Sequence, residues 1–273
     1  MNRRFISKFG VTVLVFSILI HGYVEGYPPR TGYSQEISKN NAQNPKVLFA
    51  LKVWEHWSMV PGGSSPIFIL YEDRSIIYFD KNEKVRKHVV LSEDEFARLG
   101  NILLNPHILT LNDYYSTIGA TCQNMYHFFF RISGLIYPIT VYGHPTMTRE
   151  GVTLPPKEIR EIFSLVTHFK HEDTANWLPA KIEVLFWSYD YAPDESIIWP
   201  DDWPDLSDSS TVKRGDSSYS VFLDSKHLDE LKDFIKTRRE KGAVLINGQK
   251  MSISYRISVP GENFPGHAGK KGG

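Results

Sequence analysis

Residues 67–79 read IFILYEDRSIIYF, and residues 91–104 read LSEDEFARLGNILL. The first stretch holds two runs rich in isoleucine, phenylalanine and tyrosine around a polar turn at 72–75, which predicts a β-hairpin. In the second stretch Ser92 precedes Glu95 by three residues, the spacing of a capping box at the start of a helix. The apolar face of that helix consists of Phe96, Leu99 and Leu103. The sequence therefore predicts a hairpin followed by one amphipathic helix.

The same unit of hairpin and helix follows once more. Residues 126–143, YHFFFRISGLIYPITVYG, predict a hairpin that turns at Ser133-Gly134. Residues 155–169, PPKEIREIFSLVTHF, predict a helix with two prolines at its entrance. Its buried stripe consists of Ile159, Ile162, Phe163, Val166 and Phe169.

After residue 180 the pattern starts over. The expected elements are a strand at 181–189, a strand at 219–223, a helix at 225–239 and a hairpin at 243–259. The turn of that hairpin is Asn247-Gly248, a pair typical of type I′ turns because both positions need a positive φ.

Hairpins that alternate with single helices favour antiparallel sheets with helices on one face, which is the α+β class. We expect a first α+β module at 46–171 and a second at 180–260. The two modules share an order of strands and helices rather than amino-acid identity, so the chain is compatible with two similar halves. The tail at 261–273 is expected to be disordered from its composition.

The N-terminus has the three-part pattern of a secretory signal peptide. Residues 3–8 carry three basic side chains, residues 11–20 form a run that is apolar except for Thr12 and Ser17, and small residues precede an expected cleavage point after residue 26. The alternative is an uncleaved membrane anchor, but the apolar run is shorter than the ~20 residues needed to cross a bilayer. We therefore expect a signal peptide at 1–26, a flexible leader at 27–45, and a periplasmic or extracellular protein without an integral membrane segment after cleavage.

Charge and cysteine content exclude several classes of protein. Removal of residues 1–26 takes three basic residues and one acidic residue from 31 of each, which leaves 28 against 30. A chain with a net charge this close to zero has no overall electrostatic field that would attract nucleic acid. Cys122 is the single cysteine, so no intramolecular disulfide can form and the fold must rest on its core.

Two stretches resemble a group of exported bacterial proteins of unknown function. Residues 66–79 with 89–103 are similar to their hairpin strand F-x-L-Y-x-D-G followed by a helix that opens L-S-x-E-E. Residues 203–210 with 219–234 are similar to their W-P-x-x-D-L leading into a strand and a helix. The resemblance covers about half of the chain and implies this fold and export, but no activity. It departs at Arg74, where the group has glycine.

The most conspicuous candidate site is the acidic, aromatic loop IIWPDDWPDLSDSS at 197–210. From 190 to 208 no lysine or arginine accompanies seven acids, which are Asp190, Asp194, Glu195, Asp201, Asp202, Asp205 and Asp208. Clustered carboxylates repel one another, so a hard cation would relieve a cost. One interpretation is a calcium-like site at Asp201, Asp202, Asp205 and Asp208; another is a ligand surface, including a sugar surface, at Trp199, Trp203, Asp201 and Asp202. The alternative is a purely structural role, in which the loop connects two strands and the prolines and tryptophans stiffen it.

No G-x-S-x-G elbow and no H-E-x-x-H motif occurs in the chain. We therefore expect an exported protein that binds a protein or carbohydrate ligand at the cell envelope rather than an enzyme, with calcium as the one cofactor considered. The alternative is a secreted hydrolase that uses carboxylates of the 190–208 loop.

Overall fold

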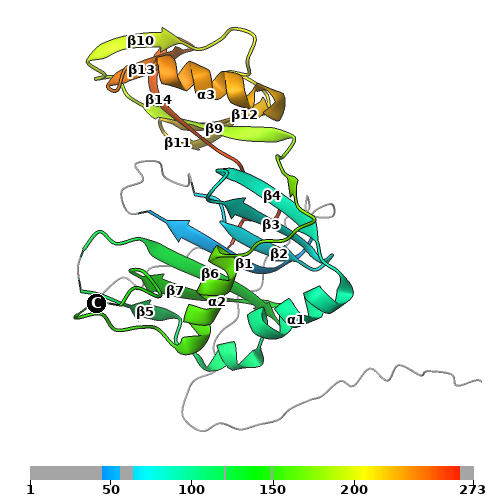
Figure 1. Cartoon of the computed structure of the whole chain (residues 1–273). Coiled ribbons are helices and arrows are strands. Elements are labelled where there is room, and N and C mark those ends of the chain that lie inside the picture. The colour runs from blue at the N-terminus through cyan, green and yellow to red at the C-terminus, as the bar shows by residue number, and fades with distance from the viewer. Residues whose placement is uncertain (1–44, 56–63, 120, 149, 265–273) are drawn as a thin grey trace, which may run out of the picture. The chain divides into compact units, whose positions relative to one another are not determined.

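The computed structural model of the chain describes residues 45–55, 64–119, 121–148 and 150–264 (Figure 1). All of these belong to one compact unit, Gly32–Gly273. The expected signal peptide and all but the last residue of the expected leader lie outside the described residues. In the part that is described, no helix has the length and apolarity needed to cross a membrane.

The first sheet has eight strands in the order β5-β7-β6-β1-β2-β3-β4-β8. They are β1 (Val47–Trp54), β2 (Phe68–Tyr71), β3 (Ser75–Asp80), β4 (Val85–Val90), β5 (Tyr114–Ser116), β6 (Met125–Ile132), β7 (Leu135–Tyr142) and β8 (Ala175–Asn176). Neighbouring strands are antiparallel except β5 and β7, which run parallel. Both predicted hairpins are confirmed, since β2 pairs with β3 and β6 pairs with β7.

The turns of these two hairpins depend on positive φ angles. Ser133 and Gly134, between β6 and β7, have φ values of 51° and 84°. Arg74, between β2 and β3, has a φ of 72° although it is not a glycine. In this left-handed region a Cβ atom approaches the carbonyl oxygen that follows it, so Arg74 is strained.

Arg74→Gly is therefore expected to raise the free energy of unfolding by up to about 1 kcal/mol. The exposed ion pair between Arg74 and Glu93, at 3.6 Å, opposes this gain only weakly. Arg74→Ala is the matched control, because alanine loses the ion pair and keeps the strain. Urea unfolding of both variants checks the prediction, and equal stabilities would contradict it.

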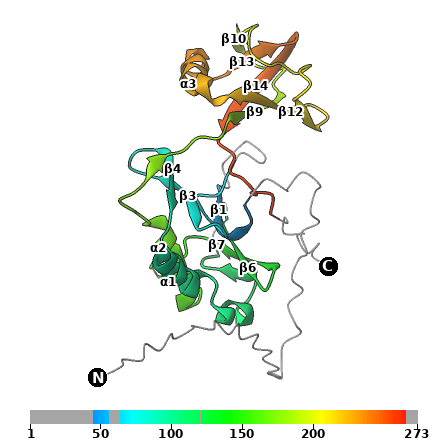
Figure 2. The same ribbon diagram turned by 90° about the vertical axis from the view of Figure 1, so that its right-hand side faces the viewer.

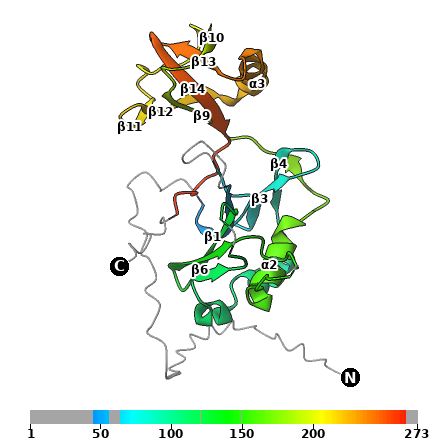
Figure 3. The same ribbon diagram turned by 90° about the vertical axis from the view of Figure 1, so that its left-hand side faces the viewer.

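Two helices pack on one face of this sheet. They are α1 (Glu93–Leu103) and α2 (Lys157–Thr167). The capping box of α1 is confirmed, since Glu95 N donates to Ser92 Oγ at 3.3 Å and Ser92 N donates to Glu95 Oε2 at 2.9 Å. Figures 2 and 3 show both helices on the same side of the strands. The core between helices and sheet includes Phe49, Phe68, Phe128, Phe130, Leu99, Leu103, Ile159, Ile162, Phe163 and Val166.

The opposite face of the first sheet is covered by the C-terminal segment, residues 257–264. Val259 is buried among residues of β1, β2 and β6, and the ring of Phe264 stacks on Phe129 with centroids 4.3 Å apart. The hydroxyl of Tyr71 donates to the carbonyl of Pro260 at 2.9 Å. Residues 261–264 therefore do not belong to a disordered tail, because an aromatic ring and a carboxylate within them have partners in the fold.

The second sheet has six strands in the order β10-β13-β14-β9-β12-β11. They are β9 (Lys181–Ser188), β10 (Asp194–Ile198), β11 (Val212–Gly215), β12 (Ser218–Asp224), β13 (Gly242–Ile246) and β14 (Gln249–Arg256). The predicted turn at Asn247-Gly248 is confirmed, with φ values of 47° and 74°. The helix α3 (Leu228–Thr237) follows a 3-10 turn at Ser225–His227 and buries Leu228 and Leu231.

The α+β class is confirmed: two mostly antiparallel sheets are accompanied by three helices in the described residues. The sheets are mostly antiparallel, and each also has one parallel pair at an edge, where β5 joins β7 and β10 joins β13. The acidic stretch at 190–208 also contains the strand β10, which adds to the sheet beside β13. In addition, β8 pairs with β4, so the first sheet extends past residue 171 into the stretch between the two expected modules.

Candidate functional site

The two tryptophans of the acidic loop lie in the core of the second sheet. Trp199 is 4% exposed and Trp203 is 8% exposed. Their ring centroids are 4.9 Å apart, and Trp199 also lies 5.0 Å from Phe186 and 5.5 Å from Phe234. The indole N–H of Trp199 donates to the carbonyl of Pro204 at 3.0 Å. Rings buried in this way offer little surface for stacking on a sugar.

Two of the loop's aspartates close local turns. Asp205 Oδ1 accepts from the backbone N and the hydroxyl of Ser207, both at 2.7 Å. Asp208 Oδ1 accepts in the same way from Ser210, at 2.8 and 2.7 Å. The serine hydroxyl is the largest cause that lowers the pKa of each aspartate, followed for Asp205 by Asn247 and for Asp208 by the backbone N–H of Ser210. These carboxylates are stabilised as anions by the loop itself.

Other acids of the 190–208 stretch are paired with groups that are distant in sequence. Glu195 lies 3.9 Å from a guanidinium nitrogen of Arg239, and Asp194 Oδ2 accepts from the backbone N of Lys241 at 3.2 Å. Asp201 and Asp202 are exposed to solvent. Across the described ranges, no group of three or more His, Cys, Asp or Glu side chains is placed to hold a metal ion. The proposed calcium ligands therefore do not converge, because turns aim Asp205 and Asp208 at their own serines.

The loop does border a hollow of about 320 Å³ beside the Asn247-Gly248 turn. It brings together four of the predicted site residues: Trp199, Trp203, Asp201 and Asp205. Asp202 and Asp208 are not part of it. Asp205 Oδ2 accepts from the Asn247 amide at 2.9 Å, which ties the loop to the turn between β13 and β14. The hollow therefore lies where the acidic loop meets the turn between β13 and β14.

A second constellation, which the sequence did not predict, centres on Glu183 of β9. Its side chain is 3% exposed and lies opposite Arg256 of β14 in the sheet register. One carboxylate oxygen accepts from Arg214 Nη2 at 3.0 Å and from the Ser220 hydroxyl at 2.5 Å. The other accepts from Arg256 Nε at 2.6 Å and from the Ser258 hydroxyl at 3.2 Å. Glu183 therefore orients two guanidinium groups.

Glu262 and Lys52 face the same region from other parts of the chain. Glu262 lies in the C-terminal segment and pairs with Arg256 Nη1 at 3.0 Å. Lys52 lies on β1, and its ammonium forms no hydrogen bond or ion pair with any described residue. Burial lowers the pKa of Lys52, while the charge of Glu262 partly opposes that shift. A partly buried cation without a paired carboxylate would be stabilised by an added anion.

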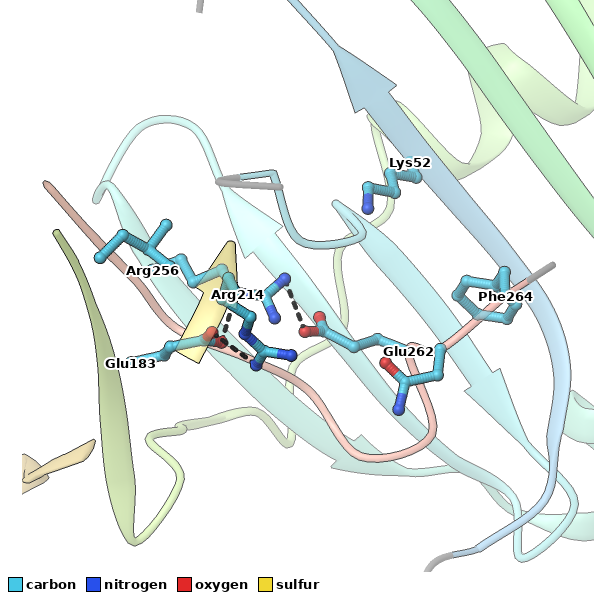
Figure 4. Close-up of a pocket in the computed structure, with 8 residues that line it drawn as sticks. Lys52, Glu183, Arg214, Arg256, Glu262 and Phe264 are labelled. Atoms are coloured by element: carbon cyan, nitrogen blue, oxygen red, sulfur yellow. Dashed lines mark hydrogen bonds and ion pairs between the residues drawn. The ribbon is translucent and has the colours of Figure 1, made fainter. Parts of the chain in front are cut away.

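These side chains line a pocket of about 280 Å³, which we call the cationic pocket (Figure 4). Its lining consists of Lys52, Glu183, Leu185, Arg214, Arg256, Glu262, Asn263 and Phe264. Figure 4 shows the Lys52 ammonium and the Glu262 carboxylate pointing toward the space beside the two guanidinium groups. Three cations face two carboxylates, so the lining carries a net positive charge at neutral pH.

The sequence held one signal for this site. Glu183 stands within KIEVLFW at 181–187, a run that otherwise predicts a buried strand. A carboxylate in such a strand requires partners, because burial of an unpaired charge is costly. Arg214, Arg256, Lys52 and Glu262 lie far from it in sequence, and no spacing rule connects them.

Fold and site together define an α+β protein with a pocket lined by three cationic and two anionic side chains. Comparison of the chain with protein-family models, with curated proteins and with solved structures finds no match.

Proposed function

We propose that this protein is exported and acts as a binding protein, and that its cationic pocket holds a small oxyanion or the carboxylate of a ligand. The observation that supports the proposal best is the ammonium of Lys52, which no described residue pairs with, beside two guanidinium groups that a buried carboxylate orients. Export rests on the N-terminal sequence pattern and on the resemblance described above.

The geometry of the arginines suits an oxyanion. Arg256 spends its Nε on Glu183 and its Nη1 on Glu262, and Arg214 spends its Nε and Nη2 on Ser220 and Glu183. A guanidinium group has five N–H donors, so each arginine keeps others for a ligand. Planar guanidinium groups match the oxygens of a carboxylate or a phosphate.

The size of the pocket narrows the class of ligand. Pockets for drug-sized molecules measure roughly 300–1,000 Å³. At about 280 Å³ the cationic pocket fits a small anion or the charged end of a larger ligand. A neutral sugar would add no negative charge beside the Lys52 ammonium, so the pocket favours an anionic ligand over the neutral carbohydrate suggested by the sequence.

The hydrolase alternative finds less support. A glycosidase needs one carboxyl group that stays protonated and acts as a general acid. The two aspartates of the 190–208 loop with shifted pKa values, Asp205 and Asp208, both have them lowered by hydrogen bonds to serines. That shift keeps them ionised, which is the wrong direction for an acid catalyst.

Addition of inorganic phosphate or, separately, malonate is expected to raise the melting temperature of the protein above that in sodium chloride of equal ionic strength. Ligands that bind the folded state stabilise it in proportion to RT ln(1 + [L]/Kd). Lys52→Met should weaken binding about tenfold, because it removes a charge partner worth ~1.4 kcal/mol. Binding should also weaken as the pH rises through the lowered pKa of Lys52, since the ammonium is charged only below that value.

Lys250→Met is the matched control, since it removes the same charge from an exposed position of β14 outside the pocket. Calorimetric titration of the wild type and both variants gives the affinities. A response to phosphate alone or to malonate alone identifies the preferred anion. Anion binding is ruled out if neither anion differs from chloride, and the pocket is ruled out if Lys250→Met weakens binding as much as Lys52→Met.

A further inference from the structure

The C-terminal segment places a carboxylate inside the cationic pocket. The Glu262 side chain is 8% exposed, and its Oε1 lies 3.0 Å from Arg256 Nη1. Its Oε2 accepts from the backbone N of Val259 at 3.2 Å, so the segment folds back on itself to present the carboxylate. Glu262 therefore contacts one of the arginines that would hold a ligand.

The charge of Glu262 reaches several groups of the first sheet. It acts to raise the pKa of Lys52, against the lowering by burial. It acts in the same way on Arg86, a buried guanidinium whose pKa burial lowers to about 10. Burial raises the pKa of Tyr71, and Glu262 adds to that shift. Glu262 thus supplies negative charge to a region that otherwise presents cations.

The contacts that hold residues 257–264 come from side chains and turns. The described residues of this segment belong to no helix or strand. Val259 and Phe264 are its apolar anchors on the first sheet, and Tyr71 holds the carbonyl of Pro260. A segment without the hydrogen-bond ladder of a strand opens at a lower free energy than the strands beneath it.

We propose that Glu262 is an internal competitor for the cationic pocket, and that an anionic ligand displaces its carboxylate and loosens the C-terminal segment. This inference rests on the function proposed above. The two events are linked: if the packed segment weakens the binding of the anion, the bound anion weakens the packing of the segment by the same free energy. The C-terminal segment at 257–264 would in this way report whether the pocket is filled.

Glu262→Gln is expected to raise the affinity for phosphate or malonate about tenfold, within the range of ~5- to 150-fold typical of coupled sites. Glutamine keeps the shape of the side chain and removes the competing charge. Glu262→Asp keeps the charge and should leave the affinity within about threefold of the wild type. Glu240→Gln, an exposed residue outside the pocket, controls for the loss of one negative charge from the protein.

Hydrogen exchange provides the second measurement. The amides of Val259, Glu262 and Phe264 donate within the segment. In the wild type, saturation with the anion should speed their exchange, while the amides of β9 and β14 exchange no faster.

The outcomes separate the two proposals. If neither the wild type nor Glu262→Gln binds an anion, both proposals fail. If the wild type binds but Glu262→Gln binds no more tightly, or if saturation leaves the exchange of the segment unchanged, the pocket stands and the competition is refuted. A gain in Glu240→Gln equal to that in Glu262→Gln would also refute it, since a general charge effect would then explain the result.

Discussion

Glu183→Gln is expected to lower the free energy of unfolding by about 3 kcal/mol, the lower end of what removal of one partner from a buried ion pair costs. Glutamine preserves the shape of the side chain but removes one of the two carboxylates that pair with Arg256, whose side chain is 16% exposed and which keeps Glu262. Arg214 is half exposed and can turn to water, which is why the lower end applies. Chemical denaturation with tryptophan fluorescence measures the change.

Two further variants test the cause. The double variant Glu183→Gln/Arg256→Met should lose less stability than the two single variants together, because both single changes break the same ion pair. Glu195→Gln removes a carboxylate from an exposed pair and should change stability little. If Glu183→Gln were no more harmful than Glu195→Gln, Glu183 would not organise the cationic pocket.

The same variant should alter the dependence of stability on pH. Burial alone would raise the pKa of Glu183, but the hydrogen bond from Ser220 and the charges of Arg256 and Arg214 together lower it below its ordinary value. A carboxyl group with a lowered folded pKa stabilises the fold above its unfolded pKa, and this contribution is lost as the pH falls through the folded value. The acid side of the stability curve should therefore be shallower in Glu183→Gln than in the wild type.

Trp199→Ala is expected to cost about 3–5 kcal/mol, as truncation of a large buried aromatic residue does. The ring contacts Phe186, Trp203 and Phe234, so alanine would leave a cavity between β9 and α3. The variant should show a lower denaturation midpoint, and Trp199→Phe should lose less because it fills part of the space.

Asp201→Asn and Asp202→Asn are the controls for this prediction, because both side chains are exposed on the same loop. Each should change stability by less than about 0.5 kcal/mol. If Trp199→Ala were as stable as these controls, the ring would not be part of the core. The loop would then again be a candidate surface for a ligand.

Local patterns predicted much of the fold. Ser92 and Glu95 form the capping box that their spacing indicated, and Asn247-Gly248 forms the expected turn. Both depend on contacts between residues at most three positions apart, which any stretch of sequence displays. The apolar stripe of α2 was predicted for a similar reason, since the helical period places its members on one face.

Pairings between distant segments were not predictable in the same way. The parallel pairing of β10 with β13 joins residues almost fifty positions apart, and the two residues of β8 carry no strand pattern at all. The candidate site followed the same division. The run of acids drew attention to residues 190–208, but the compensating Arg239 and the backbone of Lys241 come from beyond α3.

The sequence alone therefore determined the α+β class, both early hairpins and the three helices, because periodicity, caps and turns are set by neighbours along the chain. The tertiary structure decided that Trp199 and Trp203 are core residues. It also decided that Glu183 gathers Arg214 and Arg256, and that Glu262 reaches them from the end of the described chain. Burial and charge pairing act through space, so which side chains meet depends on how the sheets and the C-terminal segment pack. For that reason the most acidic stretch of the sequence and the cationic pocket lie at different places in this protein.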